Sequence, residues 1–514
     1  MNLLPVAPRA TVPAQRGWVQ GWHDLDDPDG ALRTLLDSAW RAVNAMKGAE
    51  VVAAAAMLRQ AFVQRDRFGL DFPCDEVETL LALGSLWEDD IDEAMHRAQS
   101  VLARRNGARY RSALATVMKF GYWRTRDFMP FYELSRVKAP REHASSQLAA
   151  IVNLSIEAAA EAEQLRFKLA ERLARDALFL CQASAGAEAY ASLLSTCLLA
   201  QLHYEAGAVD EADVLLRGRL TAIEESNAIE SALLAYILSA NIAAARGNQN
   251  VALLLLHRGE DIGTQRHWPR LALRCKAKEI AFHLREGRAD LAETALKQAN
   301  GFLDMPHGGG LPKGIDAWPL RIADLRLQLA HGATQSTARS LDELRNAALQ
   351  RNHPALVVEL TILLSSALYS LGHAAHAHVE LLAALRQGAD AGLFRSFVDE
   401  MPLIETPLRQ LWRSAETRSL GHLAPYIGRL LTAPPTPAPA RKKFRINHRL
   451  VESLSARETI ILRLMSLGLS NKSIARELQV TPETVKSHAK HIFIKLASKN
   501  RAEAVSRATE LGLM

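Results

Sequence analysis

The chain has 514 residues, of which 48% are hydrophobic and 23% are charged. These proportions are ordinary for a globular protein, and the length is sufficient for two or more domains with sizeable cores. No apolar run reaches the roughly 18 residues that a membrane helix needs. The four cysteines show neither a zinc spacing nor a disulfide framework. We therefore expect a cytoplasmic protein with reduced thiols and no membrane segment.

Positive charge is concentrated at the carboxyl end. The whole chain has a formal charge of +6, but residues 441–514 alone hold 15 Lys and Arg against 6 Asp and Glu, a net of +9. The rest of the chain is then net −3. This distribution predicts an anionic partner for the carboxyl-terminal part.

Helices are expected along most of the chain. Residues 1–23 contain prolines and arginines without the apolar core of a signal peptide, and we interpret them as a poorly ordered leader. From residue 24 to residue 431, alanine, leucine, glutamate and arginine dominate, and the alternation typical of strands is scarce. The segment is therefore predicted to be an all-α domain built from helical hairpins.

A repeat is visible in the second half of this segment. Glycines recur at intervals of 40, 40, 45 and 40 residues, at Gly207, Gly247, Gly287, Gly332 and Gly372. A leucine follows each glycine by nine positions, and an alanine follows four of them by five, with Thr337 in the remaining place. Glycine ends a helix tightly, and a small residue lets the next helix approach closely. The pattern predicts stacked hairpins, similar to tetratricopeptide repeats, that form a superhelix with a concave surface for ligands or partners.

Two features of this segment suggest other chemistry. The glycine run from His307 to Gly314 contains a lysine but lacks the Gly-Lys-Ser/Thr order of a phosphate loop, so we interpret it as an inter-repeat loop or a lid over the concave surface. His373 and His376 could share a helix face and bind a metal, but the sequence places no third ligand, which favours exposed or packed histidines. We predict no metal, no cofactor and no catalytic motif.

A linker is expected at residues 432–447. Four prolines within six positions favour an extended spacer that separates two domains. The basic run from Arg441 to Arg445 follows it. This run either adds contacts to phosphates or keeps the linker soluble.

The last segment, residues 448–514, is predicted to form four short helices. Ser455 and Glu458 have the spacing of a capping box, and Pro482 suits the first position of the third helix. The other helix starts are expected at the capping residues Ser470, Thr481 and Asn500. The second and third helices together form a predicted helix-turn-helix.

The predicted third helix has two different faces. Its inward face is formed by Val485, Ala489, Ile492 and Leu496. The opposite face carries Lys486, Ser487 and Lys490, joined by Glu483 and Thr484 near the start of the helix. A helix that is packed along one side and polar and basic on the other fits the major groove of double-stranded DNA. The alternative is a solvated face of a three-helix bundle that binds protein.

Several motifs in this segment resemble the LuxR-type DNA-binding domain. They are Gly468-Leu-Ser-Asn-Lys-x-Ile-Ala475, Thr484-Val-Lys-x-His488 and Arg501-x-Glu-Ala-Val505. The resemblance implies that Lys486, Ser487 and Lys490 contact bases, that Thr484, Lys472 and Lys495 contact phosphates, and that the fourth helix forms a homodimer. Ala497 departs from the glycine usual in the family, which would cost about 1 kcal/mol if that position needs a positive φ.

The order of repeats, linker and terminal domain resembles the back half of MalT-like regulators of the LuxR type. In that family an NTPase module precedes the repeats. We find no phosphate loop in this sequence, so the resemblance does not imply that this protein depends on ATP. The resemblance implies a TPR-like superhelix followed by a four-helix LuxR-type domain in a bacterial transcription regulator. Such a protein would bind operator DNA in response to a small-molecule or protein effector. The alternative is an interaction scaffold whose carboxyl-terminal domain is a docking module.

Overall fold

The computed structural model describes residues 27–64, 72–104, 110–135, 144–182, 191–303, 317–413, 423–433 and, with short gaps, 458–504. Throughout these ranges the regular elements are helices and no strand occurs, which confirms the all-α prediction. The same ranges hold no helix with the length and hydrophobicity that a membrane crossing requires. The chain divides into two compact units, with the division between Ala438 and Pro439.

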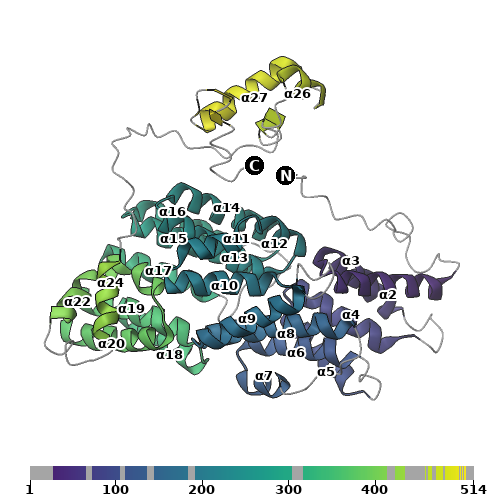
Figure 1. Cartoon of the computed structure of the whole chain (residues 1–514), viewed down its shortest axis with the longest axis horizontal. Helices are drawn as coiled ribbons and strands as arrows, with labels where there is room; N and C mark the ends of the chain where they lie inside the picture. The colour runs from purple at the N-terminus through teal and green to yellow at the C-terminus, as the bar shows by residue number, and fades with distance from the viewer. Residues whose placement is uncertain are drawn as a thin grey trace. The chain divides into compact units, whose positions relative to one another are not determined.

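The larger unit is a succession of helices in which neighbours along the chain pack against each other (Figure 1). Its first part contains α2 (Pro28–Asn44), α3 (Gly48–Val63), α4 (Cys74–Trp87), α5 (Ile91–Leu102), α6 (Arg111–Thr125), α7 (Phe128–Ser135), α8 (Ala144–Glu163) and α9 (Phe167–Gln182). The middle part contains α10 (Leu193–Ala206), α11 (Val209–Leu216), α12 (Leu220–Ser226), α13 (Ile229–Ala245), α14 (Gln249–Gln265), α15 (Pro269–Arg285) and α16 (Ala289–Leu303). The last part contains α17 (Trp318–His331), α18 (Gln335–Gln350), α19 (Pro354–Ser370), α20 (Ala374–Ala391), α21 (Arg395–Val398), α22 (Met401–Arg413) and α24 (Leu423–Thr432).

The glycine repeat has the role that its spacing predicts. All five glycines have positive φ: Gly207 93°, Gly247 78°, Gly287 71°, Gly332 114° and Gly372 84°. The residues five positions later are buried: Ala212, Ala252, Ala292, Thr337 and Ala377. Four of the leucines nine positions after the glycines are buried, and Leu296 packs against a core cluster while partly exposed. Each glycine thus ends one helix, and the small residue lets the next helix approach closely.

The first part of the unit uses the same design without glycine. Asp89 and Leu165 adopt φ values of 62° and 60° at the ends of their helices. Alanines follow at the same five- and nine-residue spacings and are completely buried: Ala94, Ala98, Ala170 and Ala174. The hairpins predicted for this region are therefore present, although their turns are formed by residues that carry side chains.

Distant hairpins also touch one another, so the stack curves back on itself. The backbone amide of Phe394 donates to the carbonyl of Glu205 at 2.9 Å. The Tyr204 hydroxyl donates to Asp399 Oδ2 at 2.7 Å. These contacts join α10 to the segment around α21, nearly two hundred residues later along the chain. A curved stack closed in this way surrounds a central space.

The carboxyl-terminal unit contains α26 (Asn471–Glu477) and α27 (Pro482–Lys495). One core cluster gathers the apolar side chains of its described residues: Ile461, Leu462, Met465, Ile474, Ala475, Val485, Ala489, Ile492, Leu496 and Ala504. It includes every residue of the inward face predicted for the third helix. The loop 307–314, the basic run 441–445, Ser455, Gly468 and Ala497 lie outside the described residues.

Candidate nucleic-acid interface and central cavity

The third helix of the carboxyl-terminal unit begins with the predicted cap. Thr481 Oγ1 accepts from the backbone amide of Thr484 at 3.2 Å, and Pro482 takes the first helical position. The fourth helix begins in the same manner, because Asn500 Oδ1 accepts from the amide of Glu503 at 2.9 Å. Side-chain caps satisfy amides that a helix start leaves unpaired. The Thr481 cap marks where α27 begins, and the Asn500 cap marks where the next helix begins.

The outward side of α27 is open to solvent. Lys486, Ser487, Lys490 and Thr484 are all exposed. Lys486 forms an ion pair with Glu483 at 3.4 Å, but the two side chains are 72% and 82% exposed. Such an exposed pair is weak, so it leaves the ammonium available to another anion. His491 is also exposed on this side, seven positions after Thr484, and our sequence argument did not include it.

Lys472 and Lys495, the other two residues predicted to contact phosphates, differ from these exposed residues. Lys472 lies in α26, but its side chain is outside the described residues. The Lys495 ammonium lies 2.8 Å from Glu458 Oε2, and both side chains are largely buried. This pair joins α27 to the first helix of the unit. Lys495 is therefore held inward by a partner 37 residues away.

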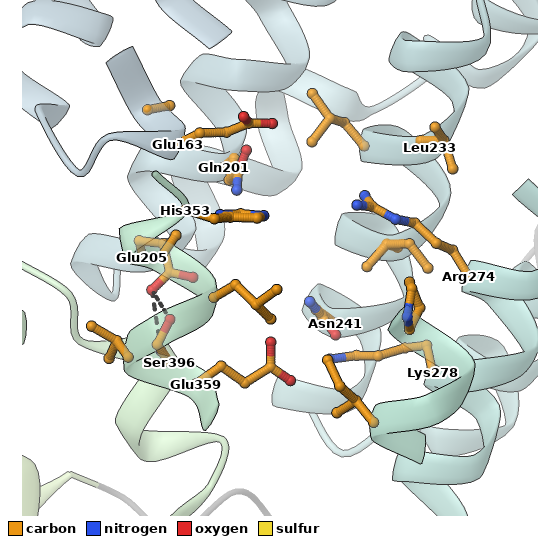
Figure 2. A pocket seen from close by; sticks show the side chains of 18 of the residues that line it. Glu163, Gln201, Glu205, Leu233, Asn241, Arg274, Lys278, His353, Glu359 and Ser396 are labelled. Atoms are coloured by element: carbon orange, nitrogen blue, oxygen red, sulfur yellow. Dashed lines mark hydrogen bonds between the residues drawn. The ribbon is translucent and has the colours of Figure 1, made fainter. Parts of the chain in front are cut away.

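A cavity of about 440 Å³ lies inside the repeat unit. Its walls come from the inner sides of several hairpins and from the segment around α21. Figure 2 shows Arg274 and Lys278 of α15 on one side, and Glu163, His353, Glu205 and Glu359 opposite them. Apolar residues complete the wall, including Leu233, Leu234, Ile237 and Ala277. A cavity of this volume is large enough for a small molecule, and its wall mixes apolar side chains with many charged ones.

Most charged residues in the cavity wall neutralise each other. The wall holds seven cationic and six carboxylate side chains. Arg326 contacts Glu400 at 2.6 Å and Glu359 at 2.9 Å, while Arg285 contacts Glu400 at 3.3 Å. Burial alone would raise the pKa of Glu400, but Arg326 and Arg285 hold it at about 2. The wall is completed by pairs joining Arg126 to Glu163, and Arg124 and Arg270 to Glu230.

Glu205 lies in the cavity wall and, among the described residues, has no cationic side chain within 4.0 Å of its carboxylate. Burial raises its pKa to about 7. The amide and hydroxyl of Ser396 both donate to Glu205 Oε2, at 3.1 Å and 2.9 Å (Figure 2). His353 faces the same space, and burial together with Arg126 and Arg274 lowers its pKa to about 2. His353 is therefore neutral at physiological pH.

The histidine cluster that suggested a metal site has another arrangement. His373 precedes α20 and is exposed, whereas His376 Nε2 lies 3.5 Å from Glu380 Oε1 on the same helix. Among the described residues, no group of three or more His, Cys, Asp or Glu side chains has the arrangement of a metal site. Burial raises the pKa of the Cys197 thiol to about 12, so this thiol is protonated and unreactive at neutral pH.

Comparison with known proteins identifies both parts of the chain. The model of the MalT-like TPR region matches residues 75–414, and the model of the bacterial regulatory proteins of the luxR family matches residues 452–508. The nitrate/nitrite response regulator protein NarL of Escherichia coli K12 is 34% identical over 125 residues, which are 24% of this chain and 52% of NarL.

Two further relatives match other lengths of the chain. The HTH-type transcriptional regulator MalT of Serratia proteamaculans is 29% identical over 210 residues, 36% of this chain and 22% of MalT. The CsgBAC operon transcriptional regulatory protein of Escherichia coli K12 is 42% identical over 67 residues, 13% of this chain and 31% of that protein. The chain thus spans about half or less of each of these relatives. Because the first model covers more than half of the chain, this protein belongs to the family of the MalT-like TPR region, and it carries a luxR-family domain after the repeats.

Proposed function

We propose that the protein is a DNA-binding transcription regulator whose α27 enters the major groove. The observation that carries this proposal is the division of α27 into two sides. Val485, Ala489 and Ile492 hold one side in the core, while Lys486, Ser487 and Lys490 are exposed on the other. Fixed orientation with a free basic face is what a recognition helix needs. The luxR-family match and the regulatory names of the relatives support the same function.

The contacts are proposed to divide between bases and backbone. Lys486, Ser487 and Lys490 would reach base edges, and His491 extends the same exposed side. Thr484 and Lys472, near the starts of α27 and α26, would bind phosphates. We leave Lys495 out of this set, because its ammonium is already paired with Glu458. Its proposed role is to fix α27 against the first helix. Phosphate contacts then supply affinity and base contacts supply sequence choice.

Two further parts of the proposal concern assembly and control. The fourth helix, which starts at Asn500, would join two copies on DNA, so that the preferred site contains two related half-sites. The cavity in the repeat unit would receive a small effector, because its volume and mixed wall suit a small molecule better than a protein segment. The proposed activity is binding rather than catalysis.

The DNA-binding part is tested by selecting duplexes from a random library with the full chain. We expect a defined sequence to be enriched. Lys490→Ala should lower affinity for it by about 1–3 kcal/mol, roughly 5- to 150-fold. Lys297→Ala is the matched control, because Lys297 is 81% exposed in the repeat unit and is expected to have no effect. If no duplex is enriched, the docking-module alternative is favoured. If Lys490→Ala binds as tightly as the unmodified chain, Lys490 is not part of the interface.

A further inference from the structure

One helix lines the cavity with a row of positive charges. Arg270, Arg274 and Lys278 lie at four-residue intervals on α15, so their side chains share one face of the helix. Arg270 is neutralised by Asp89 at 2.7 Å and by Glu230 at 2.8 Å. Within the part of the chain that the structure describes, neither Arg274 nor Lys278 has a carboxylate oxygen within 4.0 Å.

These two residues differ from every other cation of the cavity wall. Arg124, Arg126, Arg270, Arg285 and Arg326 all form ion pairs. Arg274 and Lys278 are one helical turn apart, a spacing at which like charges repel. The fold therefore places two adjacent positive charges in the wall of one open cavity, where Arg274 is exposed and Lys278 is half-buried. An anion bound between them would reduce their repulsion and give each of them an ion-pair partner.

The surroundings of these charges are unfavourable to them in the absence of a ligand. Arg274 is exposed and lines the cavity. Burial and Arg285 lower the pKa of Lys278 to about 8. Buried cations are normally paired, because removing a charge from water without a partner is costly. Figure 2 shows both side chains extending from α15 toward the opposite wall.

The rest of the cavity fits a small molecule with a carbon skeleton. Leu233, Leu234 and Ile237 contribute apolar surface to the wall of the same cavity. Asn241 Oδ1 is buried without a hydrogen-bond partner among the described residues, and Figure 2 places Asn241 close to Lys278. Once rotated, this amide can either donate to or accept from a ligand. The site therefore combines two cations, one unused amide and an apolar surface.

We propose that the cavity binds a small organic anion whose carboxylate or phosphate group lies between Arg274 and Lys278. The arginine would hold the anion by two parallel hydrogen bonds, and the lysine would contribute a point charge. The skeleton of the ligand would pack on the apolar wall. A neutral ligand would leave both cations without an ion-pair partner, and a cationic one would add to the repulsion. Only the identification of this anion as the effector rests on the proposed function.

The test measures binding of four simple anions to the full chain by calorimetry and thermal melting. The probes are inorganic phosphate, pyrophosphate, succinate and benzoate, which separate phosphate from carboxylate chemistry and charged from apolar contributions. Glucose is the neutral comparison. We expect at least one anion to bind and to raise the melting temperature, while glucose does neither. If none of the four anions binds, the proposal is overturned.

Two variants locate the binding. Arg274→Leu and Lys278→Met should each weaken anion binding 10-fold or more without lowering the melting temperature of the unliganded chain, because each removes an unpaired charge. Lys297→Met, on the exposed side of α16, should bind as the unmodified chain does. Unchanged anion affinity in both cavity variants would overturn the proposal.

Binding to the selected DNA is measured on the same samples. If the anion binds and DNA affinity changes, the anion is an effector as well as a ligand. If the anion binds without changing DNA affinity, the anion site stands and the effector role is overturned. If DNA binding is present but no anion binds, the site is overturned and the DNA-binding function stands. The two proposals can therefore fail separately.

Discussion

Two helices in this molecule carry pairs of cations with the same spacing in opposite surroundings. On α27, Lys486 and Lys490 are four residues apart and exposed to solvent. On α15, Arg274 and Lys278 are also four residues apart but line a concave cavity, where Arg274 is exposed and Lys278 is half-buried. The spacing alone therefore does not predict the partner. The concave surroundings of the α15 pair distinguish a site suited to one small anion from a helix surface suited to a long polyanion.

The difference has an energetic basis. Charges on the α27 surface are hydrated, and salt screens them over about 8 Å at physiological ionic strength. Their contribution to binding depends on neutralising phosphates and releasing counterions. Charges buried in the cavity wall, such as Arg326 and Glu400, are screened much less, so losing a partner there is costly. Variants of charged residues in the cavity wall and on the α27 surface test this comparison.

The largest expected effect comes from breaking an enclosed pair. Glu400→Gln leaves Arg326 and Arg285 without their shared carboxylate and should lower the free energy of unfolding by about 3–5 kcal/mol at pH 7. The pKa of Glu400 is held at about 2, below the usual value of 4.5, so its contribution is present above pH 4.5 and is lost as pH falls toward 2. Denaturant titrations at pH 7 and pH 3 measure the loss of stability in the variant and its dependence on pH. A loss below 1 kcal/mol at pH 7 would mean that the cavity wall is as well hydrated as the surface.

A smaller effect with the opposite sign is expected for the unpaired lysine. Lys278→Met should raise the free energy of unfolding by about 1–2 kcal/mol at pH 7, because it removes a half-buried charge that forms no ion pair among the described residues. Since the folded-state pKa is about 8 and the usual value is 10.5, the unfolded chain binds more protons between these pH values. The stability of the unmodified chain therefore rises over this window, and its difference from the variant should shrink.

This pH effect depends on all the charged groups that face Lys278. They are Arg274 and Arg285 on α15, Arg326 on α17, Glu359 on α19, and Asp399 and Glu400 beside α21. None of the carboxylates among them has a reference pKa between 8 and 10.5, and the arginines stay charged there. Denaturation of the unmodified chain and the variant at pH 7 and pH 9.5 isolates the contribution of Lys278 to the free energy of unfolding. A variant less stable than the unmodified chain at pH 7 would show that Lys278 has a structural partner.

The smallest effect is expected at the exposed pair. Glu483→Gln removes the partner of Lys486 and should change the free energy of unfolding by less than about 0.5 kcal/mol, because both side chains are exposed. It should increase DNA affinity severalfold, since one negative charge disappears from the surface that meets phosphates. Chemical denaturation and a duplex titration measure the two quantities. Weaker DNA binding in this variant would assign Glu483 a direct contact with a base.

Local rules predicted much of this fold. The buried side of α27, the cap at Thr481 and the glycine turns all follow from spacings of a few residues. In the first half the same turns were harder to find, because residues such as Asp89 and Leu165 occupy the left-handed conformation in place of glycine. The alanines five and nine positions after these residues are the part of the repeat pattern that the sequence retains there.

The cavity and the role of Lys495 depend on contacts that no local pattern contains. Glu205 meets Ser396 across 191 residues, and Lys495 meets Glu458 across 37. The four-residue spacing of Arg270, Arg274 and Lys278 is present in the sequence but supported no prediction, because a charged helix face is most often solvated. Only the curvature of the stack turns that row inward.

The salt dependence of DNA binding tests the role of α27 most directly. The full chain is titrated with its selected duplex between 50 and 200 mM salt, alone and with Lys486→Ala combined with Lys490→Ala. We expect the logarithm of affinity to fall linearly with the logarithm of salt concentration, and the double variant to bind more weakly with a shallower slope. An affinity that is independent of salt, or a double variant that retains both affinity and slope, would contradict a DNA-binding role for this helix.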